Sequence, residues 1–432
     1  MDIAALSFLL IALLFAILAT SYWIALTLAL VGTIGILLSS EASPGAVFAT
    51  SVWGASSSWT LTALPLFIWM GEILFRTRLS SDMFNGLAPW LGRVPGRLLH
   101  VNVIGSGIFA AVSGSSLATA ATIGRISLPE LSKRGYDQMM AVGSLAGSGT
   151  LGLMIPPSII MIVYGVAAEQ SIPKLFVAGV FPGIMLMMLF SGYIVVWALM
   201  NPAKVPANDI EMSFLEKVRA TFRLIPIILL IVGVIGSIYS GIATATEAAG
   251  VGVLGSLILA ILSGTLTWKS FRDSLDAAMK TTCMISIILA AASFLGIAMD
   301  YSGIPRALAE WITHMNFGPG MLIACLTVLF IILGCFIDGI SIVVIVSSII
   351  LPAVKAAGID LIWFGIFLVL VVEMSLVTPP VGMNLFLLQG MVNKDLGYVS
   401  RASLPFFLLL VVAVAVIWFW PELATFLPNR MK

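Results

Sequence analysis

Charged side chains are scarce in this chain of 432 residues. Asp, Glu, Lys and Arg make up 9% of the sequence and hydrophobic residues make up 60%, whereas an ordinary soluble domain is about 25% charged. A surface with so few charges would not remain soluble in water. The composition therefore excludes an ordinary soluble protein and predicts a protein of the lipid bilayer.

Cysteine, histidine and unbalanced charge are also lacking. The three cysteines, Cys283, Cys325 and Cys335, lie in apolar segments without paired spacing, which excludes a disulfide framework and a zinc site. His100 and His314 are the only histidines, and no HExxH or paired-aspartate motif occurs, which argues against an intramembrane enzyme. The formal net charge is +1 without a basic stripe, so nucleic acid is not an expected partner.

What the sequence does have is long apolar runs separated by short polar patches. About 20 apolar residues cross a bilayer core as a helix, and the chain has room for ten or more such passes. The runs are continuous and rich in Leu, Ile, Ala and Gly rather than alternating, which excludes an outer-membrane barrel. We predict an all-α polytopic membrane protein whose first apolar stretch, residues 4–38, is retained rather than cleaved as a signal peptide.

An internal repeat is the first sign of organisation. At an offset of 223 residues, seven residues of the first half fall on identical residues of the second: Leu128, Pro129, Gly135, Asp137, Pro156, Pro157 and Pro182 on Leu351, Pro352, Gly358, Asp360, Pro379, Pro380 and Pro405. The polar connector, residues 201–223, carries four basic residues and is predicted to be cytoplasmic. We assign repeats to residues 1–200 and 220–432 and infer that they have opposite orientations in the membrane.

Each repeat contains an apolar run that breaks in its middle. Residues 101–131 break at the SGSS sequence of residues 113–116, and residues 321–354 break at residues 337–339. About a dozen residues flank each break, which makes an arm of about 18 Å, too short to cross a core of about 30 Å. Each run is therefore predicted to be a re-entrant helical hairpin whose tip lies at the break.

A helix broken by a double proline follows each hairpin. The sequences are GTLGLMIPPSII, residues 149–160, and EMSLVTPPVGMN, residues 373–384. Proline lacks a backbone donor and clashes with the preceding turn, so both helices must unwind. Unpaired backbone at membrane depth is tolerated only inside protein or beside a cavity. The four breaks therefore predict one central polar site, where freed carbonyls suit a small cation and half-helix N-termini suit an anion.

Several residues at the breaks have two interpretations. Ser113 and Ser115 either coordinate an ion or satisfy the local backbone of a turn. Asp338 occupies the position of Ser115 in the second repeat and is either an ion ligand or the cap of the second arm. Thr378 offers both a hydroxyl and a carbonyl, whereas its repeat mate Ile155 offers only a carbonyl, so two similar but non-identical ion sites are expected.

Other candidates are less specific. Gly152 and Ser375 either let a carbonyl reach inward or serve helix packing. Asn384 is expected to bind substrate, a hairpin tip or a neighbouring helix, and Arg125 either attracts a substrate carboxylate or extends toward the membrane surface. Glu247 and Glu373 are acidic groups in apolar stretches and leave a proton path open as an alternative to sodium. The sequence alone does not decide between these interpretations.

The motifs together resemble a known family. FAAVSGSSLATAATIG with LPEL, GLMIPPSIIMIVYG, ATEAAG, FID and LVTPPVGMNLF are similar, in this order, to the large membrane subunit of the tripartite ATP-independent periplasmic (TRAP) transporters. The resemblance covers essentially the whole chain. It implies a sodium-driven importer of small organic anions such as C4-dicarboxylates, sugar acids or sulfonates, located in the bacterial inner membrane. It also implies two partners, a separate small four-helix membrane subunit and a periplasmic substrate-binding protein.

The resemblance further implies an elevator mechanism, in which a transport domain slides against a scaffold. The scaffold would comprise residues 1–100 and, with the connector, 201–318, and the transport domain residues 101–200 and 319–432. Two sodium ions are expected, the first at Ser113, Ser115, Gly152, Ile155 and Pro157, and the second at Gly334, Asp338, Ser375, Thr378 and Val381. Ser375 stands where glycine is common in the family. Substrate contacts are predicted at Ser116, Arg125, Ser158, Gly339, Gly382 and Asn384.

Two other transport mechanisms compete with this prediction. A free-standing divalent-anion/sodium symporter would also contain paired hairpins but would need no binding protein. A channel is less consistent with the sequence, because symmetric broken helices suit a bound-site carrier better than a continuous pore.

Overall fold

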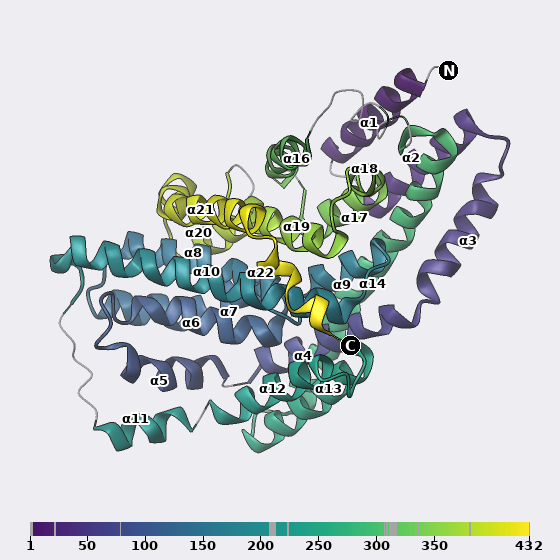
Figure 1. Ribbon diagram of the computed structural model, residues 1–432. Coiled ribbons are helices and arrows are strands. Elements are labelled where there is room, and N and C mark those ends of the chain that lie inside the picture. Colours follow the sequence, from purple (N-terminus) through teal and green to yellow (C-terminus); the bar gives the residue numbers. More distant parts are fainter. Residues whose placement is uncertain are drawn as a thin grey trace.

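The fold was analysed in a computed structural model, which describes residues 3–20, 23–77, 79–206, 213–222, 224–305, 307, 310, 318–334, 337–379 and 382–431. These residues form α-helices and short 3-10 turns without any strand. The predicted all-helical class is therefore confirmed for the described part of the chain. Figure 1 shows the helices as one elongated array with the N-terminus at one corner.

Membrane-crossing length is found in both single and bent helices. Among the described residues four helices are long and apolar enough to cross a bilayer, and three bent pairs bring the number to as many as seven. The other apolar helices have 10–17 residues. Fewer full-length spans than the ten or more predicted are present, because hairpin tips and breaks divide the apolar runs into shorter helices.

The first hundred residues wrap one end of the array. Their helices are α1 (Ile3–Ala19), α2 (Ile24–Ser39), α3 (Pro44–Ser56), α4 (Ala63–Phe75) and α5 (Leu79–Leu91). The α3–α4 pair bends by 56° around a 3-10 turn. The helices α2, α3 and α4 pack on the later helix α14, which lies beside them in Figure 1.

The first hairpin and the first broken helix follow. The hairpin arms are α6 (Leu99–Ser113) and α7 (Ser116–Lys133), and the broken helix consists of α8 (Gln138–Met154) and α9 (Ile159–Ala167). Both arms are longer than predicted, about 22 and 27 Å at 1.5 Å per residue, because each helix continues into flanking polar residues. The α8–α9 pair bends by 41° at the prolines, as the sequence predicts. The chain then continues as α10 (Ile172–Met200).

The connector leads into a second set of helices that covers the lower part of Figure 1 and continues along α2. They are α11 (Phe214–Thr221), α12 (Ile225–Tyr239), α13 (Ala245–Leu262) and α14 (Trp268–Ser302). Capping boxes fix the starts of α11 and α13, where Ser213 with Glu216 and Thr244 with Glu247 bond reciprocally. The Glu247 side chain therefore serves as a capping group at the beginning of α13.

The last hundred residues repeat the pattern of hairpin and broken helix. The second hairpin consists of α16 (Pro319–Gly334) and α17 (Gly339–Ile349), extended by α18 (Leu351–Ala356). The second broken helix consists of α19 (Leu361–Leu376) and α20 (Met383–Val392), and α21 (Leu396–Phe419) and α22 (Glu422–Thr425) complete the chain. The break predicted at residues 337–339 lies between α16 and α17, although Cys335 and Phe336 lie outside the described residues.

Helix starts in the two halves keep the spacing found in the sequence. The pairs α7 and α17, and α8 and α19, begin 223 residues apart, and the pairs α9 and α20, and α10 and α21, begin 224 residues apart. One pair differs, because the bent α3–α4 segment corresponds to the single helix α14. Each half therefore delivers a hairpin tip and a helix break, and the next section shows where these four features meet.

Candidate functional site

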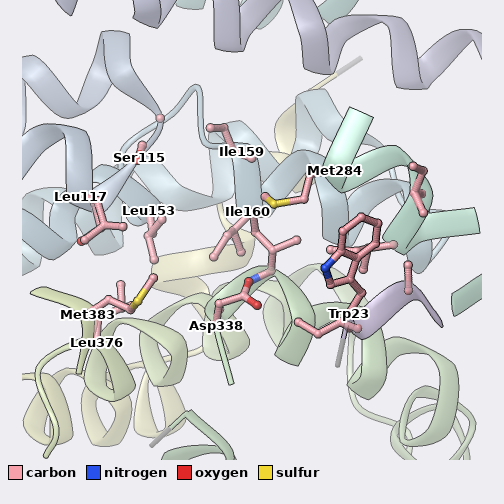
Figure 2. A pocket seen from close by; sticks show the side chains of 18 residues that line it. Trp23, Ser115, Leu117, Leu153, Ile159, Ile160, Met284, Asp338, Leu376 and Met383 are labelled. Atoms are coloured by element: carbon pink, nitrogen blue, oxygen red, sulfur yellow. The ribbon is translucent and has the colours of Figure 1, made fainter. Parts of the chain in front are cut away.

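One cavity of about 820 Å³ lies where the hairpin tips and the helix breaks meet. Its first wall comes from the starts of α7, α9, α17 and α20 and the ends of α8 and α19. The opposite wall comes from Trp23, Ile24 and Ala25 at the start of α2 and from Met284, Ile287 and Ile288 on α14. Figure 2 shows Asp338 and Met284 facing the space between the two walls.

Four helix N-termini border this cavity. Ser116, Ile159, Gly339 and Met383 are the first residues of α7, α9, α17 and α20, and all four line it. A helix N-terminus carries about half a positive charge and unpaired N–H groups, which favour an anion. No Lys, Arg or His lines the cavity. Its positive potential therefore comes from the backbone rather than from basic side chains.

The four N-termini are capped differently. Ser115 accepts from Ala118 N at 3.4 Å and Ser158 from Met161 N at 3.5 Å. Asp338 accepts from the N–H groups of Ile340 and Ser341 at 3.1 and 3.2 Å and from the Ser341 hydroxyl. The cap expected as the alternative role of Asp338 is thus formed. At α20 the cap position is Gly382, which offers no side chain.

Oxygen atoms gather at the first hairpin tip. The Ser113 and Thr119 hydroxyls lie 2.7 Å apart, and the Thr119 hydroxyl donates to the Ser115 carbonyl at 2.8 Å. Gly114 between the serines has φ +59°, and a Cβ there would lie 2.8 Å from the Pro157 carbonyl oxygen. Thr119 was not predicted from the sequence, although it lies four residues after Ser115 and so on the same helix face.

The first helix break lies directly against this tip. The α8 cap residue Ile155 is extended, with φ −81° and ψ 122°, and the carbonyls of Gly152 and Leu153 lose their helical donors because residues 156 and 157 are prolines. A Cβ on Gly152 would overlap the Ser115 carbonyl and lie 2.8 Å from Ser116 N. The structure thus brings Ser113, Ser115, Gly152, Ile155 and Pro157 together.

The second tip and break meet in a related way. A Cβ on Gly334 would overlap the Ser375 side chain, so the end of α16 touches the end of α19. The Ser375 hydroxyl donates to the Val372 carbonyl at 2.7 Å and the Thr378 hydroxyl to the Met374 carbonyl at 2.6 Å. Their lone pairs remain available as acceptors. Val381, the fifth residue predicted here, lies outside the described residues.

A hydrogen-bonded pair joins the two halves behind the cavity. Asn384 donates to the Ser116 hydroxyl at 2.8 Å, and that hydroxyl lies 3.1 Å from the Asn384 carbonyl oxygen. Both side chains are buried. The pair fastens the start of α7 to the start of α20, which is one of the contacts expected for Asn384. Ser116 and Gly339 line the cavity, whereas Ser158, Gly382 and Asn384 lie just behind its surface.

Two polar residues have positions that the sequence left open. Arg125 is exposed, does not line the cavity and has its guanidinium 5.7 Å from the centre of the Phe75 ring. Glu373 is completely buried in α19, and neither carboxylate oxygen has a hydrogen-bond partner. The polar groups near Glu373 are the Thr150 hydroxyl and the Met154 backbone on α8. Thr150 is its repeat mate, so the pair marks the crossing of α8 and α19.

Comparison with known proteins places this geometry in context. The model of the family described as "Tripartite ATP-independent periplasmic transporter, DctM component" matches residues 11–423. A C4-dicarboxylate TRAP transporter large permease of Pseudomonas aeruginosa is 33% identical over 93% of this chain and 94% of its own length. An isethionate TRAP transporter permease of Oleidesulfovibrio alaskensis is 31% identical over 85% of this chain and 58% of its own length.

Two further similarities concern substrate diversity and fold. A sialic acid TRAP transporter large permease of Vibrio cholerae is 28% identical over 88% of this chain and 89% of its own length. The solved structure of the YdaH transporter of Alcanivorax borkumensis superimposes with a TM-score of 0.66 over 93% of this chain and 96% of that one, at 13% identity. The second similarity is one of fold alone.

Proposed function

This chain belongs to the DctM family of tripartite ATP-independent periplasmic transporters as a large membrane permease, and on that basis we propose that it imports small organic anions with a sodium gradient. The relatives are named for transport of C4-dicarboxylate, isethionate and sialic acid. All three are organic anions. The convergence of four helix N-termini on one cavity is the observation that carries the proposal.

The anion is held by backbone N–H groups rather than by basic side chains. The starts of α7, α9 and α20 face the cavity without a carboxylate cap. Helix dipoles are strong ligands for an anion in a site from which water is excluded. Ser116, Ser158, Gly339, Gly382 and Asn384 are the proposed substrate contacts or their immediate supports. Arg125 serves at most to attract the anion from a distance, because it lies outside the cavity wall.

The first sodium ion is proposed to bind between the first tip and the first break. Its ligands are the Ser113 hydroxyl and the backbone carbonyls of Ser115, Gly152, Ile155 and Pro157. The fit rests on two features, the carbonyls left without helical donors and the glycine that admits the Ser115 backbone. An all-oxygen set of this kind suits a small hard cation.

The second sodium ion is proposed to bind between α16, α17 and the break after α19. Gly334, Asp338, Ser375, Thr378 and Val381 form its set. Asp338 already accepts from two amides and one hydroxyl, yet each carboxylate oxygen has further acceptor capacity. A cation here would also offset the negative charge that Asp338 brings to the cavity.

The transport step is proposed to follow an elevator mechanism with inverted repeats. Residues 101–200 and 319–432 would move together, and residues 1–100 and 201–318 would form the scaffold. The matching helix starts in the two halves support the duplication. The Ser116–Asn384 pair supports movement as one body, because it ties the hairpin of one half to the broken helix of the other. The cavity lies between this body and α2 with α14, the surface along which it would slide.

Location and partners follow from the family. The apolar helices make the chain a multi-pass membrane protein. We propose the bacterial inner membrane, with a separate small four-helix subunit and a periplasmic substrate-binding protein that delivers the anion.

Uptake into proteoliposomes tests the proposal. Vesicles contain this chain with the small subunit of its transporter, purified binding protein is outside, and an inward sodium gradient is compared with a potassium gradient. Uptake that needs both sodium and the binding protein is the expected result. Sodium-dependent uptake without the binding protein would instead indicate the free-standing divalent-anion symporter. Equal uptake in sodium and potassium would refute both proposed ion sites.

A further inference from the structure

The polar groups of the cavity all come from one wall. Ser115, Ser116 and Asp338 are its hydroxyl and carboxyl side chains, and they sit at the two hairpin tips. The tips also contribute the N–H groups of their helix starts. A transported molecule therefore finds hydrogen-bond partners on the hairpin side only.

The positive end of one of the four helices is already occupied. The Asp338 carboxylate caps α17 through the amides of Ile340 and Ser341. A second carboxylate on the transported molecule would therefore meet a negative charge at the second tip rather than a free helix N-terminus. At the first tip the cap is the neutral Ser115. The cavity has a favourable place for one anionic group, beside α7 and α20.

The opposite wall is apolar. On α14 it presents Met284, Ile287 and Ile288, and on α2 it presents Ile24 and Ala25. Apart from the indole N–H of the neighbouring Trp23, these side chains offer no donor or acceptor. A hydroxyl-rich body would lose its water here without replacement. An alkyl or aromatic body would be buried favourably, and the flexible Met284 can adapt to its shape.

We infer that the substrate is a monocarboxylate with an apolar body, such as a branched-chain or aromatic acid, rather than a dicarboxylate or a polyhydroxylated sugar acid. This inference rests on the proposed anion-import function and narrows it to a substrate class. The carboxylate binds at the starts of α7 and α20, and the apolar body lies against α14.

The test is direct binding to the purified full chain in nanodiscs, measured by calorimetry in sodium and in potassium at equal ionic strength. The probes are 4-methyl-2-oxopentanoate, phenylpyruvate, succinate and gluconate. We expect sodium-dependent binding of the first two at least tenfold tighter than that of the last two. Sodium-dependent binding of succinate or gluconate with equal or higher affinity overturns the substrate class but leaves anion import standing. Absence of sodium-dependent binding for all four overturns both.

A matched pair of variants tests the role of the α14 wall. Met284 is 51% exposed, so Met284→Gln changes the wall without disturbing a packed core. It should weaken binding of the two apolar acids about tenfold, the usual effect of losing apolar contact in a binding pocket. Met279→Gln, on the same helix, 58% exposed and away from the cavity lining, should leave binding unchanged. Equal binding by both variants would refute contact between the apolar body and α14.

Discussion

The contact between Gly152 and the first hairpin tip allows a sharp test of the first ion site. Gly152 lies one turn before the α8 break, and a Cβ at this position would overlap the Ser115 carbonyl oxygen and lie 2.6 Å from the Ser115 carbonyl carbon. Ordinary contacts of a Cβ are 3.4–4 Å. The neighbour is backbone, which cannot rotate away as a flexible side chain does. Gly152→Ala therefore requires the tip and α8 to separate by about 1 Å.

The magnitude follows from the cost of overpacking. One added methyl in a packed interior costs about 1–3 kcal/mol. The strain is largest when the tip is closed against α8, which is the state proposed to hold sodium. If the whole cost falls on that state, the apparent sodium affinity decreases by about 5- to 150-fold, since each 1.4 kcal/mol is a factor of ten.

The assay is the sodium concentration that half-saturates uptake in proteoliposomes, measured together with the thermal unfolding midpoint. Gly390→Ala is the matched control, because Gly390 is also helical, in α20, and a Cβ there has nothing within 4 Å. The control should keep wild-type sodium dependence and gain about 0.5–1 kcal/mol of stability. A Gly152→Ala protein that folds and shows the wild-type half-saturating concentration would refute the first ion site.

Three further changes separate the other parts of the site. Asn384→Ala should lower the free energy of unfolding by about 1–3 kcal/mol, because it leaves the buried Ser116 hydroxyl without its partner; chemical denaturation measures this, and an unchanged midpoint would contradict the coupling of the two halves. Thr378→Val should raise the half-saturating sodium concentration about two- to tenfold, whereas Thr327→Val, whose hydroxyl also donates to a backbone carbonyl at i−4, should not. Glu373→Gln should leave the thermal midpoint equal or higher, because it removes a buried carboxylate without a hydrogen-bond partner; a lower midpoint would indicate that a bound cation compensates this charge.

Local chemistry explains why much of the fold could be predicted from the sequence. Proline lacks an N–H wherever it stands, so Pro156 and Pro379 had to end α8 and α19 close to where the structure ends them. Gly114 could take the left-handed conformation of the first tip without strain. Because these punctuation residues recur at one offset, the matching order of hairpin and broken helix followed as well. None of these inferences required knowledge of distant contacts.

Properties that depend on distant contacts could not be predicted in the same way. The apolar runs of α2 and α14 give no sign that Ile24 and Met284 would face the hairpin tips across a cavity. Whether Asp338 caps a helix or binds an ion depends on the position of its side chain, and the structure shows that the cap is made. The lengths of the hairpin arms were underestimated because polar residues such as Lys133 remain helical outside the apolar run.

Differences between the two halves have a structural logic of their own. In the first half the small residue is on the broken helix, where Gly152 admits the backbone of the tip. In the second half the small residue is on the hairpin arm, where Gly334 admits the side chain of Ser375. Each half thus keeps close contact between hairpin and broken helix, but the glycine has changed sides. Because the second contact presents a hydroxyl where the first presents a carbonyl, the Ser375 position need not be glycine for an oxygen to reach the site. The serine that departs from the common pattern is therefore compatible with an intact second site, provided that Gly334 is retained.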